Sequence, residues 1–480
     1  MSEHTAMLRI TAEELTLPDR ESMGLAGVSY LLTLDNGFYG GIGAYGAVTG
    51  RRGGFFTGGL EAGAQMHLGR HLVLDAGMFV GGGGGGAAPQ GGGLMLRPHL
   101  GLALDTASGL FGVQLSQVHF PGGDIDSAQF GLSYAYPLTP LFGGGWSGDP
   151  PAVFGGDASG DYGRVGHDLV FQMLTYRPPS DTRNTAGAVQ DDPMSLVGVQ
   201  WNRDLGRHAF VNVAAAGAVA GQSDGYAQVL FGAGLRAELA HADVLSVELD
   251  VGAGGGGGVD TGGGALAAAV LRFEHRFRNG LSVGAYGGYL DAPDGDFEAS
   301  MGGIGLGYHY GSPARGASSS GTRYRPRHWR LRVSHQSADP DAGVRRRGGR
   351  PDERVDLIGI QIDAMLNQRF YLTGQAYGAY DGNAGGYAAG LVGAGAIVPL
   401  REDARLFLSP ELTVGAAGGG GIDVGDGLIG QARLGIGWRL GRNTALMFSA
   451  GRMIAPEGDY RANLFELGLA YRFSTLEAVD

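Results

Sequence analysis

The chain has 480 residues, of which 94 are glycine, while hydrophobic residues still make up 43%. This apolar content excludes a disordered linker, and the glycines follow no three-residue period, which excludes collagen. The sequence contains no lysine and no cysteine, which removes Walker A phosphate loops, disulfide frameworks and cysteine-bound metals. A net charge of -12 argues against nucleic acid as a partner.

Two long uncharged stretches raise the question of a membrane-spanning helix. They are Ala76 to Leu96 and Gly382 to Leu400, and both are interrupted by many glycines and a proline. A spanning helix needs about 20 mostly large apolar residues, so neither stretch fits. The first residues, Met-Ser-Glu-His-Thr-Ala, lack the basic start and apolar run of a signal peptide. If the protein is exported, its signal peptide has been removed from this numbering, or the start is incomplete.

The pattern that recurs along the chain is strict alternation. Large apolar residues occupy every second position in 130–136, 304–310 and 465–473, with small or polar residues between them. In other stretches the second set is charged, as in 245–250 and 329–334. Because successive strand residues point to opposite faces, this pattern predicts strands with one large apolar face and one small or polar face.

A soluble β-sandwich would also alternate, with its apolar face turned inward. Here, however, the second face is glycine, alanine or mixed arginine and glutamate, aromatic residues cluster near strand ends, and no helices intervene. In a barrel in lipid, apolar residues face outward and small, polar or ion-paired residues face inward. The sequence therefore predicts an all-β protein, a transmembrane antiparallel up-and-down β-barrel.

Landmarks return along the chain at nearly constant offsets. Pro121-Gly-Gly-Asp124 returns as Pro293-Asp-Gly-Asp296 and again as Pro456-Glu-Gly-Asp459, with offsets of 172 and 163. The triplet at 91–93 returns at 262–264 and 425–427, with offsets of 171 and 163. Independent landmarks that agree this closely indicate three homologous units.

Each unit contains eight predicted strands, which gives about 24 in all. Short turns such as Asp35-Asn36-Gly37 alternate with longer loops, as in outer-membrane barrels with short periplasmic turns and long external loops. The predicted organisation is repeat unit 1 at 1–138, a Gly/Pro-rich linker at 139–164, repeat unit 2 at 165–310, a Ser/Gly/Arg linker at 311–327, repeat unit 3 at 328–474 and a tail at 475–480.

Over nearly its whole length the chain resembles Gram-negative outer-membrane β-barrel proteins. The stretch from Phe465 to Phe473 is similar to the aromatic-terminated last strand that the barrel-assembly machinery reads, although seven residues follow it. Units 1 and 2 end in similar patterns at Tyr136 and Tyr310. The resemblance implies the outer membrane of a Gram-negative bacterium as the location. It also implies outer-membrane lipid, lipopolysaccharide and the barrel-assembly machinery as partners. It is a resemblance of architecture, with no named subfamily.

Two long connections, 137–164 and 311–327, leave the closure of the barrel open. They could be turns within one pore of about 24 strands. They could equally be linkers between three tandem eight-stranded barrels, whose interiors would be filled by side chains. Inward glycines without bulky neighbours favour the single wide barrel.

Glycine runs recur at one place in all three units, at 81–86, 254–258 and 418–421. One interpretation is a flexible hairpin tip. The other is a surface free of side chains, which lets a ligand or a neighbouring strand approach closely.

Two short motifs that resemble catalytic or nucleotide-binding signatures lie in predicted strands and turns. G-x-G-x-x-G occurs at 41–46, and G-x-S-x-G occurs at 221–225 and 280–284. Both motifs need a helix to follow, so we assign no nucleotide site and no catalytic residue.

Charged residues gather in the predicted external loops. Aspartate and glycine are favoured in solvated turns, and no metal-binding spacing is present, so we assign no metal and no cofactor. Arginine binds phosphate bidentately, which makes an arginine-rich loop a candidate for contact with lipopolysaccharide. The external acidic residues are Asp124, Asp126, Asp294, Asp296 and Asp459, and the lipopolysaccharide candidates are Arg345, Arg346, Arg347 and Arg350.

The leading functional hypothesis is an outer-membrane channel or export pore with a wide polar lumen, for a polymer, a bulky solute or a protein cargo. The second is a structural or surface-interaction protein of closed small barrels with ligand-binding loops. The third is an outer-membrane barrel enzyme, although we expect no enzymatic activity. The residues expected to line the lumen are Arg236, Glu238, Glu248, Asp250, Arg272, Glu274, Arg276, Arg330, Arg332 and Arg433.

Overall fold

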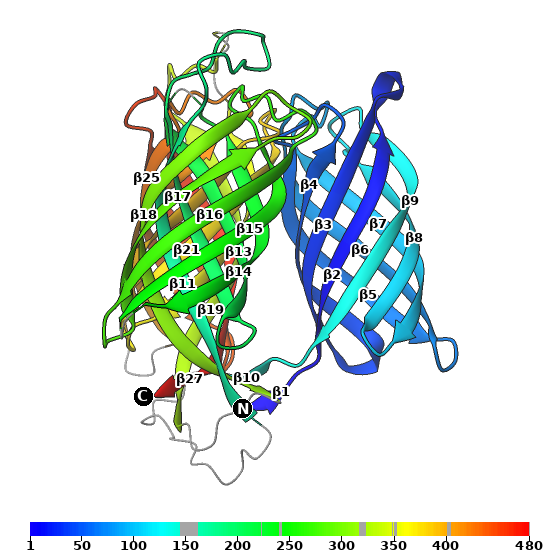
Figure 1. The fold of residues 1–480 in the computed structure, drawn as a ribbon, viewed down its shortest axis with the longest axis vertical. Coiled ribbons are helices and arrows are strands. Elements are labelled where there is room, and N and C mark those ends of the chain that lie inside the picture. Colours follow the sequence, from blue (N-terminus) through cyan, green and yellow to red (C-terminus); the bar gives the residue numbers. More distant parts are fainter. Residues whose placement is uncertain are drawn as a thin grey trace.

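In a computed structural model the chain forms three closed β-barrels, each of eight antiparallel strands (Figure 1). The structure describes residues 1–144, 162–221, 223–239, 242–315, 323–347, 349, 353–400 and 405–479. Besides strands, these ranges contain two single-turn 3-10 helices, η1 (Pro18–Arg20) and η2 (Asp35–Gly37). Within the same ranges, no helix reaches the length and hydropathy that a membrane span requires.

The strands of each barrel follow one another around the wall in chain order. The first barrel contains β2 (Ala6–Thr16), β3 (Ser22–Thr33), β4 (Phe38–Thr49), β5 (Phe56–His67), β6 (Leu72–Gly84), β7 (Leu94–Thr106), β8 (Gly109–His119) and β9 (Asp126–Leu138). The second contains β11 (Tyr162–Arg177), β12 (Met194–Asp204), β13 (Ala209–Ala220), β14 (Ala227–Glu238), β15 (Asp243–Gly255), β16 (Ala265–Arg276), β17 (Leu281–Asp291) and β18 (Glu298–Arg315). The third contains β19 (Arg323–Pro340), β20 (Val355–Met365), β21 (Phe370–Asp381), β22 (Ala388–Ala396), β24 (Leu406–Gly418), β25 (Leu428–Arg439), β26 (Thr444–Ile454) and β27 (Arg461–Val479), with the short β23 (Val398–Pro399) beside β24.

Each barrel closes by pairing its own first and last strands. In the first barrel Leu8 lies opposite Tyr136, in the second His167 lies opposite Tyr310, and in the third Trp329 lies opposite Phe473. The single barrel of about 24 strands, which we expected first, is therefore wrong, and the alternative of three eight-stranded barrels is the architecture observed. The alternating pattern did not decide between the two, because it fixes which face of a strand is apolar and not which strand is its neighbour.

Several strands continue into the segments expected to be linkers and a tail. β18 runs to Arg315, β19 begins at Arg323, and β27 extends to Val479, which pairs with Arg323. After the first barrel, β10 (Leu141–Gly144) pairs with both β27 and the N-terminal β1 (Ser2–Glu3). Backbone pairing beyond the barrel wall thus orders residues whose Pro, Ser and Gly content suggests loops.

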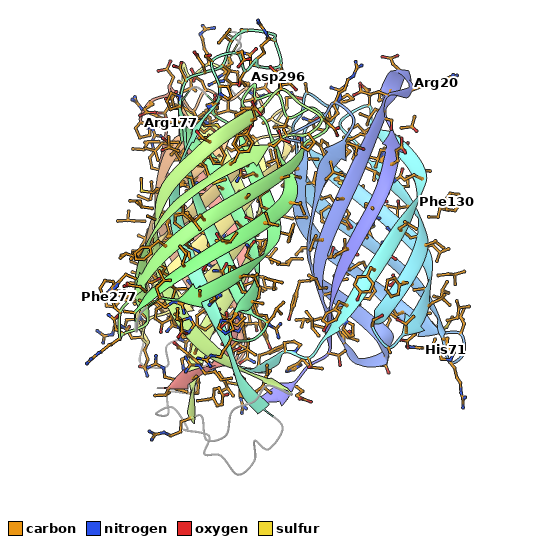
Figure 2. The ribbon with its side chains drawn as sticks, viewed as in Figure 1. Arg20, His71, Phe130, Arg177, Phe277 and Asp296 are labelled. Carbon is orange, nitrogen blue, oxygen red and sulfur yellow. The ribbon has the colours of Figure 1, made fainter. Side chains whose placement is uncertain are left out.

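The alternation places apolar side chains on the outside of every barrel. On β9 the exposed fraction is 80% for Phe130 and 65% for Leu132, whereas Gln129, which precedes Phe130, is 8% exposed. Phe130 and Phe277 point away from their barrels into the surroundings (Figure 2). In the third barrel Leu469 is likewise outward, whereas Glu466, three residues earlier on β27, is buried inside.

The three barrels contact one another in a ring, through the third strand of one barrel and the fifth strand of the next. β6 of the first barrel contacts β21 of the third, β24 of the third contacts β13 of the second, and β15 of the second contacts β4 of the first. The first and second barrels lie close together at the end that carries the long loops and separate toward the end where both chain termini lie (Figure 1).

Candidate functional site: the barrel interiors and the glycine seam

A buried polar network centred on Arg9 of β2 fills the middle of the first barrel. The Arg9 guanidinium donates to Glu61 Oε1 at 2.8 Å, to Asp75 Oδ2 at 2.5 Å and to the Tyr39 hydroxyl at 3.2 Å. His99 Nε2 lies 3.0 Å from Asp75 Oδ1. These five side chains point inward from β2, β4, β5, β6 and β7, so the network connects five of the eight strands of the wall.

A second ion pair lies nearer the loop end of the same barrel. Arg97 of β7 donates from Nε and Nη2 to the two carboxylate oxygens of Glu13 at 2.7 and 2.8 Å, and neither side chain has any exposed surface. Ser116 donates to Glu13 Oε2 at 2.5 Å. This bidentate geometry is the strong form of an arginine–carboxylate contact.

The second barrel is filled around Glu248 of β15. Glu248 accepts hydrogen bonds from Arg272, from Gln200 Nε2 at 2.7 Å and from Asn212 Nδ2 at 3.1 Å. Asn212 also donates to Asp250 Oδ1 at 2.8 Å.

Toward the turn end of the second barrel, three basic side chains lie around Asp168 of β11. Its carboxylate lies 2.7 Å from His309 Nδ1 and 3.4 Å from the Nη2 atoms of Arg236 and Arg276. Arg276 also donates to Glu274 Oε1 at 2.7 Å.

In the third barrel the arginines and carboxylates alternate in a chain. Arg332 donates to Asp363 Oδ1 at 2.8 Å and to Glu411 Oε2 at 2.7 Å. Arg433 then links Glu411 to Glu466, whose Oε2 lies 2.5 Å from Arg433 Nη1. Burial of these charges is tolerated because Arg332 and Arg433 each face two carboxylates.

An apolar cluster fills each barrel at its loop end. In each case the inward side chains of several strand ends and loops pack together and are buried. The clusters include Leu15, Leu25, Phe55, Phe79 and Phe120 in the first barrel, Tyr176, Met194, Tyr226, Leu266 and Phe297 in the second, and Tyr387, Ile422, Ile429, Tyr460 and Leu464 in the third.

Side chains therefore occupy each interior from the middle of the barrel to the loop end. The wide lumen expected from a 24-stranded barrel is not formed, because an eight-stranded wall encloses only enough room for its own side chains. The inward glycines that suggested a wide lumen sit beside these large side chains. A Cβ on Gly27, for example, would lie 2.4 Å from the Tyr45 ring.

The ten residues expected to line a lumen lie on the strands of the second and third barrels. Most point inward and take part in the networks above. Glu238 is exposed at the end of β14, and Arg276 is half-buried at the end of β16. The buried ones are Arg236, Glu248, Asp250, Arg272, Glu274, Arg330, Arg332 and Arg433.

The sequence reasoning missed the charged interior of the first barrel. On β2, Arg9 and Glu13 alternate with Leu8, Ile10 and Ala12, and on β7 Arg97 stands between Leu96 and Pro98. The same period-two signal that identified the other two interiors was present here. Around Glu61 and Asp75 many of the neighbouring positions are glycine or alanine, which weakens that signal.

Of the loop residues singled out from the sequence, those that the structure describes are exposed except for the partly buried Arg346, and some of them have partners within the protein. All five acidic residues, at 124, 126, 294, 296 and 459, are exposed. Asp296, which lies at the loop end of the protein (Figure 2), accepts a hydrogen bond from the Arg183 backbone N–H at 2.7 Å. Arg345 donates to the Gly349 carbonyl and Arg346 to the Gly382 carbonyl. Arg350 lies outside the described residues.

Backbone atoms of neighbouring barrels meet at glycines, along contacts that we call the glycine seam (β6 with β21, β15 with β4, and β24 with β13). Gly53 donates a backbone hydrogen bond to the Gly262 carbonyl at 2.9 Å, and Gly385 donates one to the Gly91 carbonyl at 3.1 Å. The glycine runs lie in this seam, which matches the interpretation of a surface free of side chains for a neighbouring strand.

The seam repeats with pseudo-three-fold symmetry. A Cβ on Gly54 would lie 2.3 Å from the Gly256 nitrogen. At the equivalent positions, a Cβ on Gly225 would lie 2.8 Å from the Gly419 nitrogen, and a Cβ on Gly386 would lie 2.8 Å from the Gly85 nitrogen. Each of these contacts joins a loop after a third strand to a glycine run after a fifth strand in the next barrel. The three units thus form a trimer within one chain.

A salt bridge reinforces the seam between the second and third barrels. Arg347 Nη2 lies 2.6 Å from Asp224 Oδ1, and the Asp224 side chain is only 4% exposed. Burial raises the pKa of the Asp224 carboxyl, and the nearby Arg347 guanidinium counteracts that rise. Arg347, one of the predicted lipopolysaccharide contacts, thus pairs with Asp224 while half of its own side chain stays exposed.

Comparisons with known proteins give only distant likenesses. No family model matches the chain, and no curated protein matches it. Similar solved structures include OpdQ of Pseudomonas aeruginosa, with 10% identity, 98% of both chains covered and a TM-score of 0.22. The ferric enterobactin receptor PfeA of P. aeruginosa has 11% identity, with 98% of this chain and 82% of that chain covered and a TM-score of 0.29. Likenesses at these TM-scores assign neither a fold nor a function to this chain.

Proposed function

We propose that the chain is an integral outer-membrane protein of a Gram-negative bacterium, with three closed barrels that span the membrane side by side. A continuous apolar outer surface on all three barrels supports this. The exposed fraction is 65% for Leu132, 67% for Leu249 and 68% for Leu412, each on a different barrel. Soluble proteins rarely expose large contiguous apolar surfaces, whereas such a surface is the normal outer face of a barrel in lipid.

Aromatic side chains at the end with the short turns support the same orientation. Phe38, Phe277, Phe370 and Trp438 lie at strand ends beside these turns and are about half exposed, at 57%, 47%, 55% and 57%. Aromatic girdles mark the membrane interfaces of transmembrane barrels. The short turns and both termini would then face the periplasm, and the long loops and the glycine seam would face outward.

Within the membrane we propose a structural or surface-interaction role, carried by the closed barrels and their loops. The observation that carries this proposal is the filling of all three interiors by ion pairs and apolar clusters. It gives no support to passage of a polymer or protein cargo, and we propose no enzymatic activity. Outer-membrane lipid, lipopolysaccharide at the exposed Arg345, and the barrel-assembly machinery remain the proposed partners.

Conductance of the purified protein in planar bilayers tests this role. We expect no stable large conductance steps, because each interior is occupied by its own side chains. Heat-modifiable migration in gels, measured on the same sample, verifies that the barrels are folded. Stable steps of a wide pore from the folded protein would reject the closed-barrel role in favour of transport.

A narrow conduit for small solutes is a second candidate, favoured by one observation. The middle of each barrel is polar, and in the second barrel the charged cluster around Asp168 extends this polar interior to the turn end. Separation of the ion pairs would leave a hydrated path in the second barrel as far as the apolar cluster at its loop end. If this candidate is right, replacing Tyr226 and Phe297 of that cluster with alanine gives the second barrel a small conductance that the unaltered protein lacks.

A further inference from the structure

The ring of three barrels encloses a space along its pseudo-three-fold axis. Each barrel contacts its two neighbours through its third and fifth strands. When three barrels touch pairwise, the short arc of wall between the two contacts faces the axis. That arc is the fourth strand of each barrel, which is β5 in the first, β14 in the second and β22 in the third.

The outward side chains of these three strands are apolar at every level. Equivalent positions form successive layers, and none of them contains a polar or charged side chain. Going from the loop end toward the turn end, the layers are Phe56, Ala227 and Ala388; Gly58, Val229 and Gly390; Leu60, Phe231 and Val392; Ala62, Ala233 and Ala394; and Ala64, Leu235 and Ala396.

The axis is open below the seam. A Cβ on Gly58 or Gly390 would meet no atom within 4 Å, whereas a Cβ on Gly82 in the seam would lie 2.6 Å from a backbone oxygen of the neighbouring barrel. The alanines of the fourth layer, Ala62, Ala233 and Ala394, are all exposed. The three barrels therefore surround a space that their own side chains do not fill.

This space is continuous with the lipid-facing surface toward the turn end. On the contacting strands β21 and β24, Leu372 and Leu412 have exposed fractions of 50% and 68%, so the barrels no longer touch there. The close backbone contacts of the seam lie at the opposite, loop end. The space is thus bounded at one end of the membrane and open at the other.

We propose that this axial space binds the acyl chains of membrane phospholipids, drawn from the leaflet on the turn side. Water needs polar partners inside a cavity, and a wholly apolar lining offers none. Acyl chains fit the lining chemically and can enter from the surrounding lipid. This inference rests on the proposed membrane location and adds a specific lipid site to it.

Single-cysteine variants test the site, since the native chain has no cysteine. A bimane fluorophore is attached at Ala233→Cys on the axis and at Leu306→Cys on the outer face of the second barrel, and each protein is reconstituted into liposomes. Brominated phosphatidylcholine and aqueous iodide serve as quenchers. We expect brominated lipid to quench both positions and iodide to quench neither.

The alternative outcomes separate the two proposals. Quenching of Leu306→Cys alone by brominated lipid, with Ala233→Cys unaffected or quenched by iodide, overturns the lipid site while the membrane location stands. If brominated lipid fails to quench Leu306→Cys in a folded protein, the membrane location itself is overturned. Ala394→Cys, the equivalent position in the third barrel, repeats the measurement if the first variant does not fold.

Filling the space provides an independent measurement. The variant with Ala62, Ala233 and Ala394 all changed to tryptophan should co-purify with less phospholipid phosphorus per protein after detergent extraction. The matched control carries tryptophan at three exposed outer alanines, Ala128, Ala285 and Ala450. An equal phospholipid content in both folded variants would overturn the site.

Discussion

Gly82 on β6 and Gly378 on β21 are in reciprocal contact across two barrels. A Cβ on Gly82 would lie 2.6 Å from the Gly378 carbonyl oxygen, and a Cβ on Gly378 would lie 2.6 Å from the Gly82 carbonyl oxygen. Because the obstacle on each side is backbone, a larger residue must push the barrels apart. The contact therefore depends on glycine at both positions.

Gly378→Val should weaken the contact between the first and third barrels. Overpacking of this kind typically costs about 1–3 kcal/mol, and thermal unfolding in detergent measures it. Gly374→Val is the matched control, since Gly374 lies on the same face of β21 and a Cβ there would meet only the Ile362 side chain at 4.0 Å. Equal unfolding temperatures for the two variants would argue against a tight seam.

Barrel closure can be tested by disulfide crosslinking. Ile10 on β2 lies directly opposite Tyr134 on β9, so a cysteine pair at these positions should form a disulfide readily. A pair at Ile10 and Leu469 should not, because Leu469 belongs to the third barrel and pairs with Val333. Efficient crosslinking of the second pair in the folded protein would restore the single large barrel.

Arg332→Leu should destabilise the third barrel strongly. The substitution leaves Asp363 and Glu411 buried with fewer compensating charges, and breaking a buried pair this way costs about 3–5 kcal/mol. Denaturant unfolding in detergent, followed by tryptophan fluorescence, measures the loss. Arg452→Leu is the control, since its ion pair with Asp341 is exposed and should contribute little.

Leu469→Arg should disturb membrane insertion. Leu469 is 53% exposed on the outer face of β27, and an arginine facing mid-membrane lipid costs about 2–4 kcal/mol. The yield of heat-modifiable protein in outer-membrane fractions measures the effect. Normal insertion of a stable Leu469→Arg protein would mean that this face does not contact lipid.

Gly468→Arg should be at least as harmful, although Gly468 faces the other way. A Cβ there would lie 3.2 Å from Ser334 Cβ inside the third barrel. A wide lumen would have accommodated the arginine, but the filled interior does not. The folded yields of the two variants are compared in lipids of different composition. Lipid composition should alter the yield of Leu469→Arg, whose arginine faces lipid, and not that of Gly468→Arg, whose arginine clashes inside the barrel.

Much of the fold could be predicted from the sequence, since strand facing depends on local order. The alternation that runs from Phe130 to Tyr136 predicts Phe130 outside and the preceding Gln129 inside, and it does so without knowing which strands are adjacent. The repeated landmarks likewise indicated three units of eight strands. These features depend on residues two apart or on offsets along the chain, both of which are visible in one sequence.

Closure and the site could not be predicted in the same way. Whether Leu8 pairs with Tyr136 or with a residue near Phe473 depends on contacts between distant segments, and both partners have the same alternating pattern. The Arg9 network needs five side chains from different strands to meet. The glycine runs showed where a close approach was allowed, but only the three-dimensional arrangement identified another barrel as the approaching partner.

The head-to-tail geometry of the glycine seam limits how copies of this protein can associate. Contacts of unlike surfaces, third strand against fifth, build open filaments unless a ring closes. Here the ring closes within one polypeptide, and all three third strands and all three fifth strands are used. All the contact surfaces of the seam are therefore occupied within one molecule. Assembly of the three barrels into a ring does not depend on the concentration of the protein in the membrane. Because the three copies are encoded separately, a substitution in one seam leaves the other two unchanged, so the three contacts can diverge independently.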